Sequence, residues 1–475
     1  MSRFLGPDFL LDTSTARHLF HDVAKPLPIV DFHNHLSPQD IAQDRHWDNL
    51  GALWLEHDHY KWRVMRWAGV PESHVTGSAD FRAKFDAFAR VMPRIVGNPV
   101  HHWSHLELWR HFGLEGVVLT QDTAARVWDT AAERLLERGF GARGLLAQMN
   151  VSYVATTDDP CDTLEHHAAF AAEAATGLRM VPTFRPDPAL YPEDAGFAAW
   201  LDRLEAASGQ SIATYAELLS ALLQRLDHFR AHGARAADHG LNRLDVIDPA
   251  TQAEGDATLS HARLGQTVSH AAAAAFRHRL LLDLGRAYAA HDMVMQLHMG
   301  PLRNTRSRLM TGFGRDAGAD SLRDAPLAEA LNALLDGLDR DNALPRTILY
   351  ALDPGKTPVI VTTAGNFQDG SLAGKVQPGT AWWFNDQLDG METQMRTLAQ
   401  MGLISTFLGM LTDSRSFLSF PRHEYFRRLL CRMIGTWAET GHLPDDPEQL
   451  DALVRDICYR NAAAWFNPTE GAKCD

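Results

Sequence analysis

Short apolar runs and longer amphipathic segments alternate along most of this chain. The first run covers residues 27–32 and ends in polar side chains, as a barrel strand does at its carboxyl end. Further runs predict strands at residues 151–157, 180–185, 234–239, 293–298, 346–352, 375–382 and 404–411. Helical spacing between them, as in residues 215–232 and 265–291, favours a parallel sheet with crossover helices. The pattern predicts an α/β fold, a (β/α)₈ barrel of the TIM type.

One long stretch departs from this alternation. Residues 39–148 carry helical patterns rich in Trp, His and Arg and no convincing strand pattern, which predicts a large helical insertion after the first strand. The chain then divides into residues 1–38, the N-terminal segment with the first barrel strand, residues 39–148, the insertion, and residues 149–475, the remaining barrel. The last part ends in helical patterns at residues 426–440 and 447–461.

A β-branched segment, residues 357–364, resembles a strand by composition. It lies between the sixth and seventh predicted strands, where a parallel barrel needs a crossover helix, and Gly365 and Asn366 then offer a helix stop. We therefore predict a helix there.

Composition limits which partners the protein can bind and in which compartment we expect it. The net charge of -14 argues against a nucleic acid or an anionic membrane, and no apolar run reaches the ~18 residues of a spanning helix. The four cysteines are far apart, and the first residues lack the pattern of a secretory signal. We expect a cytoplasmic protein. The sequence leaves open whether the chain forms a homo-oligomer.

The clearest candidate chemistry follows the first strand. His33 and His35 are two residues apart, so their side chains point to one face and can share a divalent cation such as zinc. Asp413 follows the eighth predicted strand, which lies beside the first in a closed barrel, and can serve as third ligand and as proton acceptor. The alternatives are two polar loop histidines and an aspartate that caps a helix.

Further candidates end other predicted strands. His298 is a fourth ligand, a substrate contact or a buried core histidine. Arg185, Arg303 and Arg415 lie just beyond strand ends, and guanidinium groups bind carboxylates in bidentate fashion. Because the chain is acidic overall, these arginines would have to attract an acidic substrate locally.

Weaker candidates lie in the insertion and at two strands. His59 and Tyr60 are plausible proton carriers, although both residue types also pack widely. Asp238 ends the fourth strand, and Trp382 in residues 381–386 offers a wall for a polyol, or simply core packing.

Five blocks carry a resemblance to a known family: residues 31–36 (DFHNHL), 298–304 (HMGPLRN), 374–377 (GKVQ), 382–387 (WWFNDQ) and 409–420 (GMLTDSRSFLSF). With them the chain resembles the uronate isomerases (glucuronate isomerases), an isomerising branch of the amidohydrolase superfamily. The resemblance implies conversion of D-glucuronate to D-fructuronate and of D-galacturonate to D-tagaturonate with a divalent metal, commonly zinc. It also implies the roles of the matching residues: His33, His35 and Asp413 as ligands, His59 and Tyr60 in carbonyl polarisation and proton transfer, and Arg185 and Arg415 on the substrate.

Small departures, Pro301 and Pro378, lie beside these residues and remove none of them. The rival function is a metal-dependent hydrolase of the amidohydrolase type, which needs two cations and a bridging Lys or Glu on strand four, where this chain offers Asp238 and His239. A second rival is a sugar-acid binding protein without turnover. A single cation with an aspartate base suits enolisation, so the sequence favours the isomerase.

Overall fold

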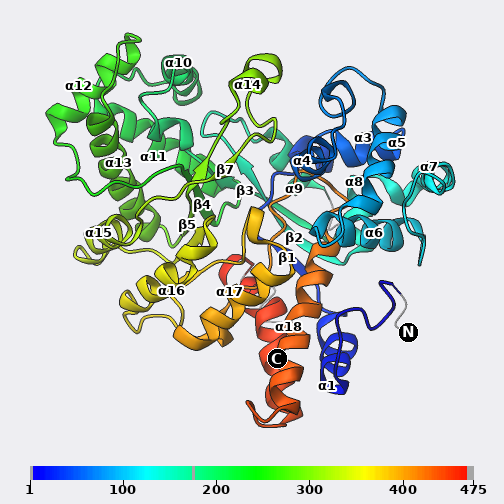
Figure 1. The fold of residues 1–475 in the computed structure, drawn as a ribbon. Helices are drawn as coiled ribbons and strands as arrows, with labels where there is room; N and C mark the ends of the chain where they lie inside the picture. The colour runs from blue at the N-terminus through cyan, green and yellow to red at the C-terminus, as the bar shows by residue number, and fades with distance from the viewer. Residues whose placement is uncertain (1–3, 174–176, 468–475) are drawn as a thin grey trace.

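The computed structural model describes residues 4–173 and 177–467 and contains a curled parallel sheet at its centre (Figure 1). The strand order is β1-β2-β3-β4-β5-β8-β9, with every neighbouring pair parallel. The strands are β1 (Ile29–Asp31), β2 (Val151–Asp158), β3 (Arg179–Phe184), β4 (Ala236–Leu241), β5 (Val294–Met299), β8 (Thr347–Ala351) and β9 (Val376–Pro378). A short antiparallel pair, β6 (Pro301–Leu302) and β7 (Ser321–Leu322), stands apart. The α/β class and the first seven predicted strands are confirmed.

The prediction of an eighth strand at residues 404–411 is wrong. Ile404–Thr406 forms a 3₁₀ turn, and the described residues that follow join no sheet ladder. Gly409 has a φ of 75°, a left-handed conformation that interrupts an extended strand. The segment still lies beside the end of β1, because the Asp413 N–H donates to the His33 carbonyl at 3.2 Å. The sheet is therefore a half-barrel of seven strands that this segment borders.

Residues 39–148 are all described, and their regular elements are helices. Together with Pro38, which begins the first of them, they form α2 (Pro38–Ala42), α3 (Leu50–Leu55), α4 (His59–Trp67), α5 (Phe81–Val91), α6 (Pro99–Phe112), α7 (Ala124–Leu135) and α8 (Ala142–Gln148), with short 3₁₀ turns. Polar N-caps begin several of them, among them Asp58 for α4 and Asp80 for α5. Their apolar faces share one buried cluster with Ile29 and Val151 of the sheet. The group thus packs on one side of the half-barrel (Figure 1).

Most of the helices between β2 and α18 (Pro421–Glu439) cover the other part of the sheet and the cavity rim. The helices of this region are α9 (Glu165–Ala172), α10 (Phe197–Ser208), α11 (Tyr215–Ala231), α12 (Gln252–Arg263), α13 (His270–Ala290), α14 (Ser307–Phe313), α15 (Ala328–Asp339), α16 (Thr357–Asn366) and α17 (Leu388–Met401). The first of them, α9, instead packs on α2 of the insertion. Helix α16 confirms the helix predicted at residues 357–364. A large apolar cluster fills the space between β3, β4, β5 and helices α10 to α13 and α15.

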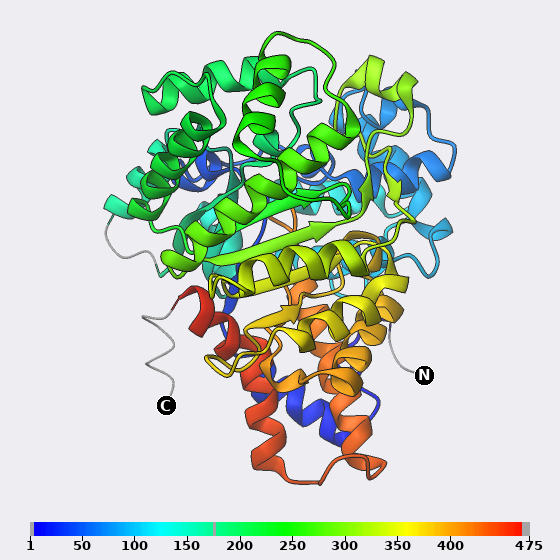
Figure 2. The same cartoon turned by 90° about the vertical axis from the view of Figure 1, so that its left-hand side faces the viewer.

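Both ends of the described chain pack on the same side of the sheet (Figure 2). Helix α1 (Ser14–His18) lies against α18 (Pro421–Glu439), and α19 (Pro447–Arg455) and α20 (Asn461–Phe466) follow. Buried Arg427 joins them, since its guanidinium donates to the carbonyls of Ala24, Leu27 and Pro28 ahead of β1. Of the helices in residues 4–173 and 177–467, none has the length and apolarity to cross a membrane.

Candidate active site

A cavity of about 730 Å³ opens at the carboxyl ends of the strands. It brings together most of the predicted site residues: His33, His35, His59, Arg185, His298, Arg303, Trp382, Asp413 and Arg415. Two predicted residues, Asp238 and Tyr60, are not among the described residues that line it. Both lie directly behind residues that do, and their contacts are described below.

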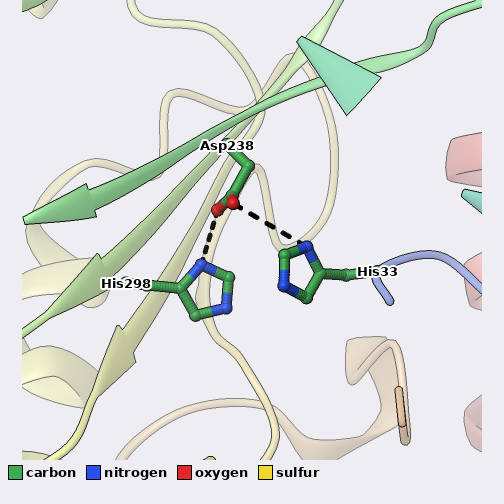
Figure 3. A group of neighbouring side chains, drawn as sticks. All are labelled: His33, Asp238 and His298. Atoms are coloured by element: carbon green, nitrogen blue, oxygen red, sulfur yellow. Dashed lines mark hydrogen bonds and ion pairs between the residues drawn. The ribbon is translucent and has the colours of Figure 1, made fainter. Parts of the chain in front are cut away.

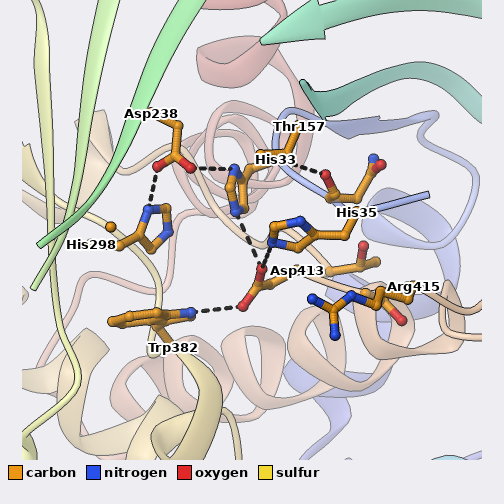
Figure 4. A network of polar contacts seen from close by, with 12 residues as sticks. His33, His35, Thr157, Asp238, His298, Trp382, Asp413 and Arg415 are labelled. Carbon is orange, nitrogen blue, oxygen red and sulfur yellow. Dashed lines mark hydrogen bonds and ion pairs between the residues drawn. The ribbon is translucent and has the colours of Figure 1, made fainter. Parts of the chain in front are cut away.

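His33, His35 and Asp413 meet at the cavity floor (Figure 4). The Nε2 atoms of His33 and His35 lie 3.2 and 3.1 Å from Asp413 Oδ1. Burial disfavours the charge of Asp413, but its hydrogen bonds to both imidazoles hold the pKa of this carboxyl well below its usual range. Burial lowers the pKa of His35 to about 4, so its imidazole is neutral at pH 7. A carboxylate and a neutral imidazole are the states in which these groups bind a cation.

Behind this group, Asp238 bridges His33 and His298 (Figure 3). Its Oδ1 lies 2.6 Å from His298 Nδ1, and its Oδ2 lies 3.9 Å from His33 Nδ1. Arg185 Nη1 contacts the same Oδ2 at 2.9 Å. Against the effect of burial, Arg185 and the two histidines hold the pKa of Asp238 well below its usual range. Asp238 is fully buried, so it orients His298 and Arg185 from beneath the cavity floor.

The ring of His298 is fixed on two sides. It stacks on the Tyr350 ring at 4.1 Å with an interplanar angle of 1°. With Nδ1 engaged by Asp238, its buried Nε2 has no hydrogen-bond partner among the described residues. A buried imidazole nitrogen left without a partner points to a ligand or substrate contact.

The three arginines stand around the cavity but are held differently. Arg185 is bound by Asp187 at 2.8 Å as well as by Asp238. Arg303 lies over the Trp383 ring at 5.2 Å. Arg415 lies 3.7 Å from Asp316 and is a third exposed, and Arg303 lies 3.8 Å from the same carboxylate. Arg303 and Arg415 are therefore the more available for an incoming carboxylate, while Arg185 is preorganised.

His59 and Tyr60 begin helix α4, whose N-cap is Asp58. His59 faces the cavity, and burial followed by the charge of Arg415 lowers its pKa to about 4. Tyr60 stacks on His59 at 4.8 Å, but its hydroxyl donates to Asp386 Oδ2 at 2.9 Å. Burial and Asp386 raise the pKa of the Tyr60 phenol well above its usual value.

Trp382 does more than form a wall. Its indole N–H donates to Asp413 Oδ2 at 2.7 Å, so both carboxylate oxygens of Asp413 have a partner. Asp413 itself has a φ of 45° and Trp383 a φ of 53°, left-handed conformations that cost energy for residues with side chains. Such strain concentrates at functional sites, as the location of these two residues at the cavity illustrates.

Three residues that support the site were not predicted individually. Asp187 follows Arg185 by two positions and binds both its guanidinium and the Gly240 N–H. Asp386 and Arg422 are buried around Tyr60. Asp187 carried a weak signal, an acid just past a strand end, whereas the other two act through contacts between segments distant in sequence.

The cavity floor fits a divalent cation. One atom each of His33, His35 and Asp413 lie within 4.8 Å of one another, and the same holds for His33, Asp238 and His298. Two imidazoles and one carboxylate form a common ligand set for a catalytic divalent ion, which leaves a coordination position for substrate. The unpartnered Nε2 of His298 beside this set agrees with that fit.

Comparison with known proteins identifies relatives over the whole fold. The family described as glucuronate isomerase matches residues 1–466. A uronate isomerase from Salmonella newport is 49% identical over 468 residues, which cover 98% of this chain and 99% of that protein.

Two solved structures agree in fold. The uronate isomerase from Thermotoga maritima superposes with a TM-score of 0.92 at 36% identity and covers 98% of this chain and 100% of its own. The glucuronate isomerase from Caulobacter crescentus gives a TM-score of 0.87 at 27% identity, over 96% of this chain and 94% of its own. Each likeness therefore extends over nearly the full length of both proteins.

Proposed function

The chain belongs to the glucuronate isomerase family and is an aldose–ketose isomerase of uronates; from this premise we propose how its cavity performs the reaction. The substrates are D-glucuronate and D-galacturonate, converted to D-fructuronate and D-tagaturonate through an enediol. The observation that carries the proposal is the convergence of His33, His35 and Asp413 in a cavity that three arginines surround.

His33, His35 and Asp413 hold one divalent cation, zinc by preference for this ligand set. When bound, such a cation supplies Lewis-acid polarisation of a substrate carbonyl. A single cation is favoured over two, because Asp238 is already neutralised by Arg185 and hydrogen-bonded to His298. A hydrolase of the amidohydrolase type would need a second cation in that place, so the alternative function is not favoured.

The arginines bind the substrate carboxylate. Arg303 and Arg415 have free donor capacity toward the cavity, and Arg185 adds a fixed positive charge. Trp382 and Trp383 provide apolar walls against the sugar chain. Asp238 contributes from beneath by orienting His298 and Arg185, a positioning role in place of direct substrate contact.

Proton transfer requires one group to take the C2 proton while O1 becomes protonated, which gives the enediol. Loss of the O2 proton and return of a proton to C1 then give the ketose. Asp413 and Tyr60 are the two candidates for the base. Asp413 is already ionised, whereas Tyr60 is a neutral phenol and could take the proton only after losing its own. Neutral His59 can donate a hydrogen bond to the substrate oxygen. The low pKa of Asp413 makes it a weak base, so carbonyl polarisation has to supply several kcal/mol.

Incubation of the purified protein with each uronate, with and without a chelator, tests this proposal. We expect ketose formation that the chelator abolishes and added zinc restores, one equivalent of metal per chain, and deuterium wash-in at C1 in D₂O. Asp413→Asn is expected to lose most of the activity. Hydride transfer without wash-in, together with full activity of Asp413→Asn, would contradict the scheme. The cytoplasmic location and a homo-oligomer stay predictions.

A further inference from the structure

A second, smaller cavity of about 180 Å³ lies behind His59 and Tyr60. We call it the rear cavity. His59 and Trp383 line both it and the main cavity, so these residues form a wall between the two. Asp386 lines the rear cavity and is almost fully buried, with 3% of its surface exposed.

The Tyr60 ring in this wall is held on its faces and at its tip. His59 stacks against it, the Trp103 ring meets it edge-on at 5.6 Å, and the Arg422 guanidinium lies over it at 4.8 Å. These contacts fix the ring plane but not the direction of the hydroxyl. That direction is set by Asp386, which accepts the Tyr60 hydroxyl at 2.9 Å.

The two carboxylate oxygens of Asp386 have different surroundings. Its Oδ2 is 3.8 Å from Arg422 Nη1, while its buried Oδ1 has no hydrogen-bond partner among the described residues. Burial raises the pKa of Asp386 to about 7, against the effect of Arg422. A buried carboxyl with one unsatisfied oxygen is costly for folding alone, which points to a functional reason for its presence.

We propose that Asp386 is a positioning residue for the isomerisation: through its hydrogen bond it fixes the Tyr60 hydroxyl behind His59, on the rear-cavity side of the wall between the two cavities. The inference rests on the proposed function, in which Tyr60 takes part in proton transfer. Asp386 itself touches neither the main cavity nor the metal ligands, so it acts through Tyr60.

A double-mutant cycle tests this. We expect Asp386→Ala to lower kcat on the order of 10- to 100-fold, the range for a lost hydrogen bond to a charged group, with KM changed less than about threefold. Asp386→Asn keeps an acceptor oxygen and the shape, and should recover most of kcat. If Asp386 acts through Tyr60, the double variant Tyr60→Phe/Asp386→Ala should be no slower than Tyr60→Phe by more than about twofold.

The chain offers a matched control far from the cavity. Tyr215 on α11 donates its buried hydroxyl to Asp283 on α13 at 2.8 Å, with Arg279 beside the carboxylate. Tyr215→Phe and Asp283→Asn should lower the thermal midpoint without changing kcat. Thermal midpoints and metal content of the Asp386 variants then separate a positioning effect from a folding defect.

Three outcomes would overturn the inference while leaving the isomerase function intact: additive effects in the cycle, an unchanged kcat for Asp386→Ala, or an unchanged kcat for Tyr60→Phe. If Asp386→Ala does not fold, Asp386→Leu replaces it in the cycle, because leucine keeps a similar volume without an acceptor oxygen, and it must lower kcat below that of the control variants while Asp386→Asn does not. A wild-type chain that fails to isomerise either uronate would contradict the proposed function instead.

Discussion

Gly240 leaves the space that the Arg185 side chain occupies, because glycine has no Cβ. A Cβ at this position would lie 2.5 Å from Arg185 Nη2 and 2.7 Å from Asp187 Oδ2. We expect Gly240→Ala to displace the Arg185–Asp187 pair and to lower kcat/KM for uronates about 10- to 100-fold, mainly through KM. Steady-state kinetics of the variant measure this.

Gly365 on α16 is the control for that substitution, because a Cβ there meets no atom within 4 Å. Gly365→Ala should leave the kinetics unchanged and stabilise the helix slightly. If Gly240→Ala also keeps the wild-type KM, Arg185 does not depend on the tight fit of Gly240 for its position.

Asp158 at the end of β2 makes stability depend on pH. Burial raises the pKa of its carboxyl to about 7, whereas in the unfolded chain it titrates near 4. Between these values the folded state holds a proton that the unfolded state releases, so Asp158 lowers the free energy of unfolding as pH rises through this window. In Asp158→Asn that loss disappears, and its stability relative to the wild type should rise by about 2 kcal/mol between pH 5 and 7.5.

Urea unfolding at several pH values checks this, with Asp324→Asn as control because the Asp324 side chain is 99% exposed. The control should follow the wild-type curve throughout. Parallel curves for Asp158→Asn and wild type would show that Asp158 does not titrate differently in the folded chain.

At the residue scale, the sequence predicted what depends on local spacing. The two-residue spacing of His33 and His35 after a strand is enough to place both near one point, and the structure brings Asp413 to that point. The direction of the Tyr60 hydroxyl was not predictable, because Asp386, more than 300 residues away along the chain, determines it. Asp238 was predicted to end the fourth strand, but β4 continues to Leu241, and the Asp238 side chain lies beneath the cavity, where only the packed sheet puts it.

At the scale of elements, the start of α4 is a buried charge cluster. Asp58 caps the helix and pairs with Lys61 at 2.6 Å, and Glu107 lies 3.5 Å from the same ammonium group. Asp58→Ala removes the cap and leaves a buried cation poorly compensated, so it should cost about 3 kcal/mol of stability. Because His59 and Tyr60 form the first turn, kcat should fall as well. Denaturant unfolding and kinetics measure the two effects.

Asp80→Ala is the matched control in the same insertion. Asp80 also caps a helix, α5, but it is exposed and pairs with no ammonium group of the described residues, so its loss should cost only about 1 kcal/mol and leave kcat unchanged. Equal costs for the two variants would mean that the buried charge of Lys61 adds nothing to the role of Asp58.

One helix could be predicted because the connection between two strands was considered together with the local sequence pattern. Residues 357–364 have a strand-like composition, yet the need for a crossover between two parallel strands predicted helix α16 correctly. Residues 404–411 have a strand pattern too, and the same reasoning failed there. The left-handed Gly409 cannot be recognised from apolar periodicity, although it breaks the strand.

At the scale of the whole molecule, the absence of a strand at residues 404–411 changes how the chain after the last strand is attached to β1, the first strand of the half-barrel. Asp31 at the end of β1 accepts both the Thr412 N–H and the Thr412 hydroxyl, each at 2.7 Å, and also contacts His423 of α18 at 3.2 Å. The buried Asp31 carboxylate thus attaches residue 412 to β1, a role that the backbone hydrogen bonds of an eighth strand would have in a closed barrel. Because Asp413 directly follows Thr412, the same attachment places Asp413 against His33.

Asp31→Ala should therefore loosen the junction and the proposed metal site together. Leaving the buried Thr412 donors without an acceptor is expected to cost about 3–5 kcal/mol, and kcat and zinc affinity should fall with it. Thr412→Val keeps its N–H bond to Asp31 and loses only the hydroxyl bond, so its cost should be about 1 kcal/mol. Denaturant unfolding, zinc titration and kinetics on the three proteins give the comparison. Wild-type zinc affinity in a destabilised Asp31→Ala chain would mean that Asp413 is held by Trp382 and the histidines alone, independently of how the half-barrel closes.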